Sequence, residues 1–290
     1  METPRWFAPL LSSRTAYLFL GKLGIVLLLA LPFRLVVGSP GFYALGGAED
    51  WLEVFHPASQ TWHYPPVQGF LNPPWLQVVL TPFRWLEPLD AWTVLCSLSV
   101  LAAWTVAQQS QKPVLSFLAV ALSPAFLAVL GKGNVDGMLL ICLSLPGAWK
   151  ALLPLTKPQG SIGLLVVAWK RDRRGLLVLV CLLSLSSLVL WGLWPLCYPK
   201  THLAGAYGWR SDWWLGSLMG LAMLMLAWKR NSTSLALTAS VFLSPYLNCY
   251  SVLPALAAWA VEEPEATKKA IPLWWAALIF MAIHNCPQGP

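Results

Sequence analysis

The segment LDAWTVLCSLSVLAAWTVAQ, Leu89–Gln108, decides the fold class of this chain. Asp90 is its only charged residue, and the segment is long enough for a transmembrane helix, which needs about 20 residues. Hydrophobic residues make up 57% of the chain and charged residues only 11%, with a mean hydropathy of +0.62, which excludes an ordinary soluble domain. We therefore predict an all-α, polytopic transmembrane helical bundle.

Similar apolar runs recur along the whole chain. The 290 residues have room for about eight to ten crossings with short loops, so we treat residues 1–290 as a single integral-membrane domain. Prolines predict re-entrant or broken short helices, with Trp75–Leu86 lying at the interface and Lys157-Pro158-Gln159 breaking the run Ala151–Trp169. The other predicted spans are Tyr17–Val37, Val114–Leu130, Met138–Trp149, Gly175–Trp194, Trp213–Trp228, Thr233–Leu247, Tyr250–Val261 and Ile271–His284.

The distribution of basic residues predicts the orientation. No lysine or arginine occurs between Leu35 and Phe83, although the chain carries a net charge of +7. Basic residues collect on the cytoplasmic side of membrane proteins, so the first loop, about residues 38–74, is predicted to be extracytoplasmic and the N-terminus cytoplasmic. Clusters such as Lys170–Arg174 then lie against membrane lipids rather than nucleic acid. We expect an integral protein of a bacterial plasma membrane.

Three acids in the first loop are candidates for chemistry. Glu53 follows Glu49 and Asp50 by four and three positions, so a short helix would bring either of them beside it. A carboxylate with a like-charged or partly buried neighbour suits a general base that deprotonates an acceptor hydroxyl. The alternative interpretation is an acidic surface loop.

Two lysines are candidates for binding an anion. In Gly131–Gly137, Asn134 is placed to cap a helix that begins near Asp136, and exposed N–H groups with Lys132 would suit a phosphate. A simple capped turn explains the same glycines. Lys157 lies between apolar runs, where an ionisable side chain either faces a functional cavity or reaches the interface from a helix end.

The first loop also offers histidines and tryptophans. The sequence predicts no cofactor, although a divalent metal ion held by His56, His63 and the nearby acids is an alternative to ordinary hydrogen bonding. Most of the 18 tryptophans lie near predicted span ends, as in interfacial belts. Trp51 and Trp62, within the loop, are the ones placed to stack on a sugar ring.

Four short motifs in a fixed order carry a resemblance to a known family. They are Tyr64-Pro65-Pro66, Gly133–Gly137, Lys157-Pro158-Gln159, and Ser244-Pro245-Tyr246 with Tyr250 and Leu253-Pro254. Together they resemble the GT-C superfamily of integral-membrane glycosyltransferases, particularly the polyprenol-phosphate-mannose-dependent mannosyltransferase-like family.

The resemblance implies transfer of mannose or another hexose from a polyprenyl-phosphate-sugar donor to an unknown acceptor at the extracytoplasmic face. It implies Asp50 or Glu49 as the base, and a phosphate held by Lys157 and Lys132. The other residues expected in the substrate site are Asn134, Asp136, Gln159, Tyr64 and Arg210. An alternative function is a non-catalytic membrane protein that binds or translocates a polyprenyl-phosphate or phospholipid headgroup.

Overall fold

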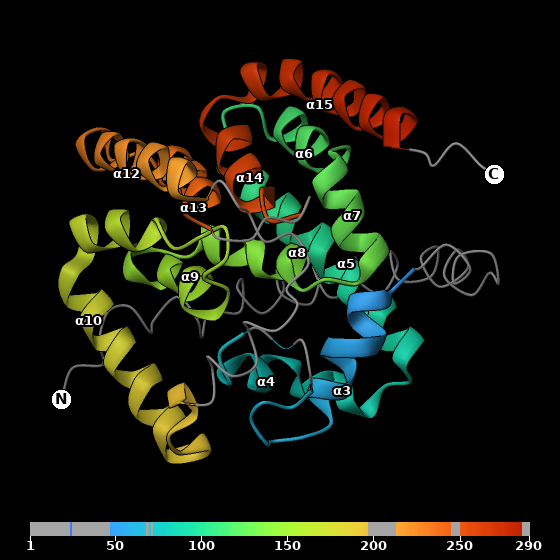
Figure 1. Cartoon of the computed structure of the whole chain (residues 1–290), viewed down its shortest axis with the longest axis vertical. Helices are drawn as coiled ribbons and strands as arrows, with labels where there is room; N and C mark the ends of the chain where they lie inside the picture. The colour runs from blue at the N-terminus through green and yellow to red at the C-terminus, as the bar shows by residue number, and fades with distance from the viewer. Residues whose placement is uncertain are drawn as a thin grey trace.

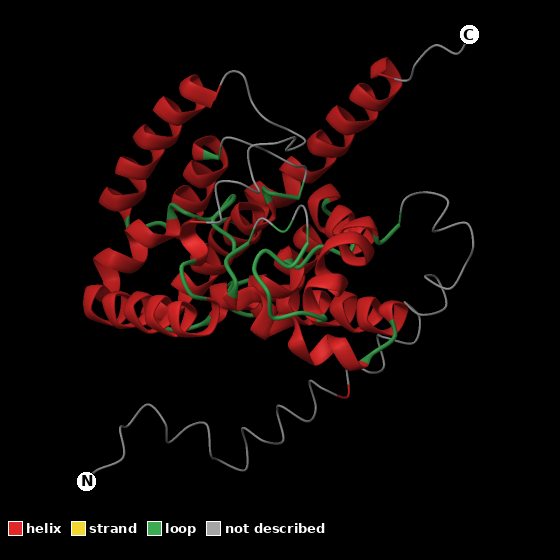
Figure 2. Ribbon diagram, turned by 60° about the horizontal axis from the view of Figure 1, so that its bottom comes forward, coloured by secondary structure: helices red, strands yellow, loops and turns green. Residues whose placement is uncertain are grey.

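The computed structural model describes residues 47–67, 70, 72–196, 213–244 and 250–285, together with Gly24. Within these ranges all regular structure is helical and there is no strand (Figure 2). The predicted all-α class is therefore confirmed. The first predicted span, Tyr17–Val37, lies outside the described residues apart from Gly24.

Two helices are long and apolar enough to cross a membrane. They are α5, Pro88–Ala107, which matches the predicted span Leu89–Gln108 closely, and α10, Leu164–Trp191. The most apolar window of α5 is 56% buried, whereas that of α10 is only 17% buried. Helix α5 is therefore central, while α10 lies at the periphery (Figure 1). Several leucine and valine side chains of α10 are exposed.

The predicted span Val114–Leu130 is a bent pair of helices. Helix α6, Pro113–Ala121, meets α7, Pro124–Lys132, at 58°. The break occurs at Ser123-Pro124 because the Ser123 hydroxyl accepts from Phe126 N–H and caps α7, while proline has no N–H to continue α6. Counting this pair as one span gives three candidate crossings in the described part of the chain, compared with the eight to ten predicted for the whole chain.

The predicted span Met138–Trp149 is not one helix. It comprises α8, Asp136–Leu139, and the 3₁₀ helices η4, Leu140–Ser144, and η5, Gly147–Ala151. The chain then breaks where the sequence predicted a break: α9, Leu152–Thr156, ends because Lys157, which precedes a proline, adopts an extended conformation with φ −138° and ψ 85°.

A second break lies inside α10. Asp172 leaves helical geometry, with φ −153° and ψ 73°, and its carboxylate accepts from Gly175 N–H at 2.9 Å. Asp172 therefore caps the outer part of α10, which begins where the sequence places the start of the span Gly175–Trp194.

The remaining helices complete the bundle around α5. Helix α12 packs along α13, α14 lies between α13 and α15, and α15 lies along α6 (Figure 1). In the described part of the first loop, residues 51–59 form two short helices. The bounds are η2 Trp51–Phe55, α3 His56–Ser59, α4 Trp75–Leu80, η3 Thr81–Trp85, α12 Trp213–Arg230, α13 Thr233–Leu243, α14 Leu253–Glu262 and α15 Pro264–Asn285.

Candidate functional site

Asn134 joins the first loop to the two segments that follow α7. Its Nδ2 donates to Asp50 Oδ2 at 2.7 Å, and its Oδ1 accepts from Lys157 Nζ at 2.6 Å and from Asp136 N–H at 3.1 Å. The reversed amide orientation would place an NH₂ group against the ammonium of Lys157. The amide therefore holds a carboxylate and a cation at fixed positions on its two sides.

Lys157 and Asp136 form a buried ion pair. The Lys157 ammonium lies 2.8 Å from Asp136 Oδ1, and the two residues are 5% and 4% exposed. A charge at such depth is costly unless it is paired. The Asp136 carboxylate and the Asn134 amide oxygen are hydrogen-bond partners of the Lys157 ammonium. We call Asp50, Asn134, Asp136 and Lys157 the buried polar cluster. Its four members come from three segments that sequence analysis had selected separately.

Aromatic rings complete the surroundings of Lys157. Its Nζ lies 5.8 Å from the ring centre of Phe55 and 5.4 Å from that of Tyr250, within the range of cation–π interactions. Phe55 was not predicted as a site residue. Its only signal in the sequence is that it lies five positions after Asp50, in the same short helical segment. Tyr250 belonged to the fourth motif but received no role from it.

Two glycines allow the segments to approach one another. Gly133 ends α7 with φ +69°, and a Cβ there would lie 2.4 Å from Trp51 Cβ. Gly160, with φ +77°, follows Lys157, and a Cβ there would lie 2.3 Å from the Ser251 carbonyl oxygen. Only glycine fits these positions, which bring Asn134 to the first loop and Lys157 to Tyr250.

The buried polar cluster lies part of the way along α5. The backbone at Gly137, next to Asp136, approaches the side chain of Ser99 near the middle of α5. Toward the start of α5, Trp51 Nε1 donates to the Pro88 carbonyl at 2.8 Å. Helical rise places Ser99 roughly 17 Å from Pro88, so the ion pair lies well inside the bundle.

Glu49 and Lys132 form a separate, exposed ion pair. Lys132 Nζ lies 2.9 Å from Glu49 Oε2, and the two side chains are 45% and 50% exposed. The backbone beside them is also joined, since Ala48 N–H donates to the Gly131 carbonyl at 2.7 Å. The two candidate bases therefore have different environments: Glu49 is exposed and paired with Lys132, whereas Asp50 is half-buried and hydrogen-bonded to Asn134.

Tyr64 and Gln159 are the other predicted substrate residues that the structure describes. Tyr64 donates to the Asn72 carbonyl at 3.1 Å, and its ring contacts Phe70, which in turn contacts Phe55. Gln159 is half-buried in the turn after Lys157. Arg210 lies outside the described residues.

The structure corrects one sugar-stacking prediction. Trp51 is fully buried, and its ring packs edge-on against Phe83 at 5.3 Å, so it cannot stack on a sugar. Trp62 is 46% exposed and stacks on Trp191 at 6.0 Å, so it keeps an open surface. A tryptophan in a polar loop looks the same in sequence whether it anchors the loop or faces solvent.

No metal centre is formed in the part of the chain that the structure describes. There, no group of three or more histidine, cysteine, aspartate or glutamate side chains is placed to hold an ion. His56 Nε2 instead lies 3.4 Å from the Leu86 carbonyl oxygen.

The buried polar cluster offers two chemical functions. Lys157 supplies a positive charge in a water-poor site, where electrostatic attraction to a phosphate is stronger than at a surface. Asp50 accepts from Asn134 through Oδ2, and within the described residues no hydrogen bond occupies Oδ1, which is available to accept from a hydroxyl. One amide thus positions a cation and a carboxylate, and Asp136 balances the charge of that cation. Comparisons with family models, curated proteins and solved structures found no match to this chain.

Proposed function

We propose that this protein is a membrane glycosyltransferase that moves a hexose from a polyprenyl-phosphate donor to an acceptor hydroxyl. The observation that carries the proposal is the buried polar cluster, in which Asn134 links Asp50 to Lys157. The resemblance to GT-C glycosyltransferases selected the same segments independently of their contacts. The proposal includes a bundle of eight to ten membrane crossings and a first loop that lies outside the cytoplasm.

In the proposed reaction Asp50 is the general base. It takes the proton of the acceptor hydroxyl as that oxygen attacks the anomeric carbon of the sugar. The bond from the anomeric carbon to the phosphate oxygen breaks, and the polyprenyl phosphate leaves with the electron pair, so the sugar is transferred with inversion. Asp50 is preferred to Glu49 because Glu49 is neutralised by Lys132 at the surface.

Lys157 is proposed to stabilise the phosphate of the donor. Charge grows on that phosphate as the bond breaks, so a fixed ammonium favours the transition state over the bound donor. Asp136 holds the ammonium in place while the site is empty, at 2.8 Å. Trp62 is the exposed aromatic surface against which a sugar ring can stack.

The test is transfer of radiolabelled mannose from polyprenyl-phosphate mannose in proteoliposomes. We expect Asp50→Asn to lower the initial rate at least about a hundredfold, the usual contribution of a general base. Glu49→Gln removes the same charge one position earlier, and it should retain the rate within about threefold, because an exposed ion pair contributes little. Full activity of Asp50→Asn would refute the assignment of the base.

The second candidate function is binding or translocation of a polyprenyl phosphate without transfer. The observation that favours it is that Asp136 already satisfies Lys157, as a resting anion would in a site that only exchanges anions. The wild-type protein would then show no transfer from any hexosyl donor, yet bind polyprenyl phosphate through Lys157.

A further inference from the structure

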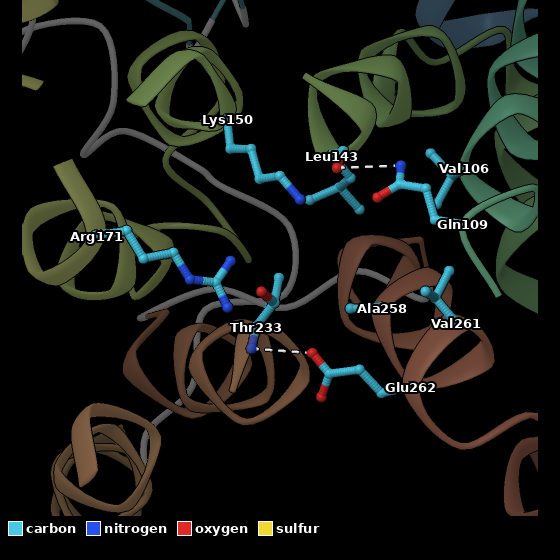
Figure 3. A pocket seen from close by; sticks show the side chains of 9 residues that line it. All are labelled: Val106, Gln109, Leu143, Lys150, Arg171, Thr233, Ala258, Val261 and Glu262. Carbon is cyan, nitrogen blue, oxygen red and sulfur yellow. Dashed lines mark hydrogen bonds between the residues drawn. The ribbon is translucent and has the colours of Figure 1, made fainter. Parts of the chain in front are cut away.

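A second site lies at the C-terminal end of α5 and shares no lining residue with the buried polar cluster. There a cavity of about 200 Å³ opens between α5, η5, α10, α13 and α14. Val106, in the last turn of α5, and Leu143 and Val261 form its apolar side, and three charged side chains point into it (Figure 3). Among these residues, sequence analysis predicted an interaction only for Arg171, as part of the basic cluster Lys170–Arg174 expected to lie against membrane lipids.

Two cations from different segments reach the cavity. Arg171 is held at its edge, since its Nε and Nη2 donate to the side-chain and backbone oxygens of Asn231 at 3.1 and 2.8 Å. Lys150 extends from η5 toward the same space (Figure 3). Among the described residues Lys150 has neither an ion pair nor a hydrogen bond from its ammonium group, so its charge is directed at the cavity rather than at a protein anion.

Glu262, the one carboxylate among the described residues that line the cavity, already accepts hydrogen bonds from the protein. Glu262 accepts from the backbone N–H groups of Thr233 and Ser234 at 3.0 and 3.2 Å, and from the Ser232 hydroxyl at 2.9 Å. It therefore caps the start of α13, where its charge also meets the positive end of the helix dipole. Among the described residues Glu262 forms no ion pair with Lys150 or Arg171, so its charge does not directly neutralise either cation.

The size and position of the cavity restrict that ligand. Sites for drug-sized molecules occupy roughly 300–1,000 Å³, so this cavity suits a small anionic group. It lies beside the last turn of α5, a helix long and apolar enough to cross a membrane. The ends of a spanning helix lie near the lipid headgroups, where basic side chains attract anionic lipids. We propose that the cavity binds the phosphate group of an anionic ligand, supplied by a membrane lipid headgroup or by free phosphate.

The titration of Lys150 agrees with this assignment. Burial, and then the nearby charge of Arg171, lower the pKa of the Lys150 ammonium, and Glu262 opposes this only in part. A cation in such a position is stabilised by an incoming anion.

The test measures binding to the full-length protein in neutral detergent micelles by native mass spectrometry. The probes are a dioleoyl phosphatidate and, as the neutral lipid, a dioleoyl phosphatidylcholine. Lys150→Gln and Arg171→Gln should each weaken phosphatidate binding about tenfold, the effect of losing one charge-assisted hydrogen bond. Lys150→Arg should restore it. Arg174→Gln is the matched control, because Arg174 belongs to the same basic segment but lies outside the cavity.

The inference does not depend on the proposed function, because the cavity and the buried polar cluster share no residue. Displacement by inorganic phosphate would identify free phosphate as the ligand, and resistance to displacement would identify the lipid headgroup. Equal binding by wild type and by folded Lys150→Gln and Arg171→Gln variants, or an equal loss in Arg174→Gln, would overturn the proposal.

Discussion

Asn134 Nδ2 lies 2.7 Å from Asp50 Oδ2, a hydrogen bond between residues 84 positions apart in the chain. The same amide accepts from Lys157 Nζ through its oxygen. Asp50 and Lys157, of opposite charge and from distant segments, are therefore held at a fixed separation by one small side chain. This relationship is the basis of the proposed transfer site.

Breaking the buried ion pair of Lys157 and Asp136 should strongly lower the free energy of unfolding. Lys157→Met or Asp136→Leu alone leaves a buried charge without its partner, and we expect each to cost about 3–5 kcal/mol. The double variant should cost less than the sum of the two, because no charge then remains buried. Thermal unfolding in detergent measures all three.

The exposed ion pair of Lys132 and Glu49 is the control for these two single variants and the double variant. With side chains 45% and 50% exposed, it should contribute about 0–1 kcal/mol. Equal losses from the two pairs would show that Lys157 and Asp136 are not buried together.

Gly133 should tolerate no side chain. Its φ of +69° and a Cβ position 2.4 Å from Trp51 Cβ predict that Gly133→Ala costs at least about 1–3 kcal/mol. Gly131 lies two positions earlier in α7, and a Cβ there would have no atom within 4 Å. Gly131→Ala should therefore be neutral or stabilise by about 0.5–1 kcal/mol. Thermal unfolding of both variants tests this, and the account fails if Gly133→Ala is as stable as Gly131→Ala.

The two tryptophans of the first loop should respond differently to truncation. Trp51 is fully buried and donates to the Pro88 carbonyl, so Trp51→Ala should cost about 3–5 kcal/mol. Trp62 is 46% exposed, so Trp62→Ala should lower stability much less while reducing the rate of sugar transfer. Chemical denaturation gives the first comparison and the proteoliposome assay the second. A stable Trp51→Ala variant would contradict the buried position of Trp51.

Anion binding at the second cavity should weaken at alkaline pH. The charged groups around Lys150 are Arg171 and Asp172 from α10 and Glu262 from α14. Because the pKa of Lys150 is lowered from 10.5, its ammonium loses its proton at a lower pH than an ordinary lysine. Phosphatidate affinity should fall as pH rises through that lowered pKa.

Lys150→Arg is the control for this titration. A guanidinium stays charged over the same range, so the variant should keep its phosphatidate affinity. Binding curves measured at a series of alkaline pH values show the difference, and identical pH profiles for wild type and Lys150→Arg would exclude Lys150 as the titrating group.

Much of the helical pattern could be predicted from the sequence. Helix α5 was located to within one residue at each end because a long apolar run between Pro88 and Gln108 allows few alternatives. The break at Lys157-Pro158 was predicted from the proline, and the structure gives its physical reason, because the residue before proline avoids helical geometry. Met138–Trp149 was predicted less well, because apolar composition alone does not distinguish one helix from several short helical turns.

The site could be predicted only in part. The motifs indicated Asn134, Asp136 and Lys157, but adjacent Glu49 and Asp50 looked equivalent until the fold turned one toward the surface and the other inward. The second cavity could not be foreseen, because Lys150, Arg171 and Glu262 meet only through the packing of separate helices.

The most direct test of the central claim is equilibrium binding of polyprenyl phosphate to Lys157→Gln and Lys132→Gln, two variants with the same loss of charge. We predict that Lys157→Gln binds at least about tenfold more weakly than wild type, as expected for losing a charge-assisted contact, while Lys132→Gln binds within about twofold of wild type. Lys157→Arg, with its charge retained, should bind better than Lys157→Gln. Unchanged binding by a folded Lys157→Gln protein, or an equal loss in Lys132→Gln, would contradict the assignment of the buried polar cluster as the donor site.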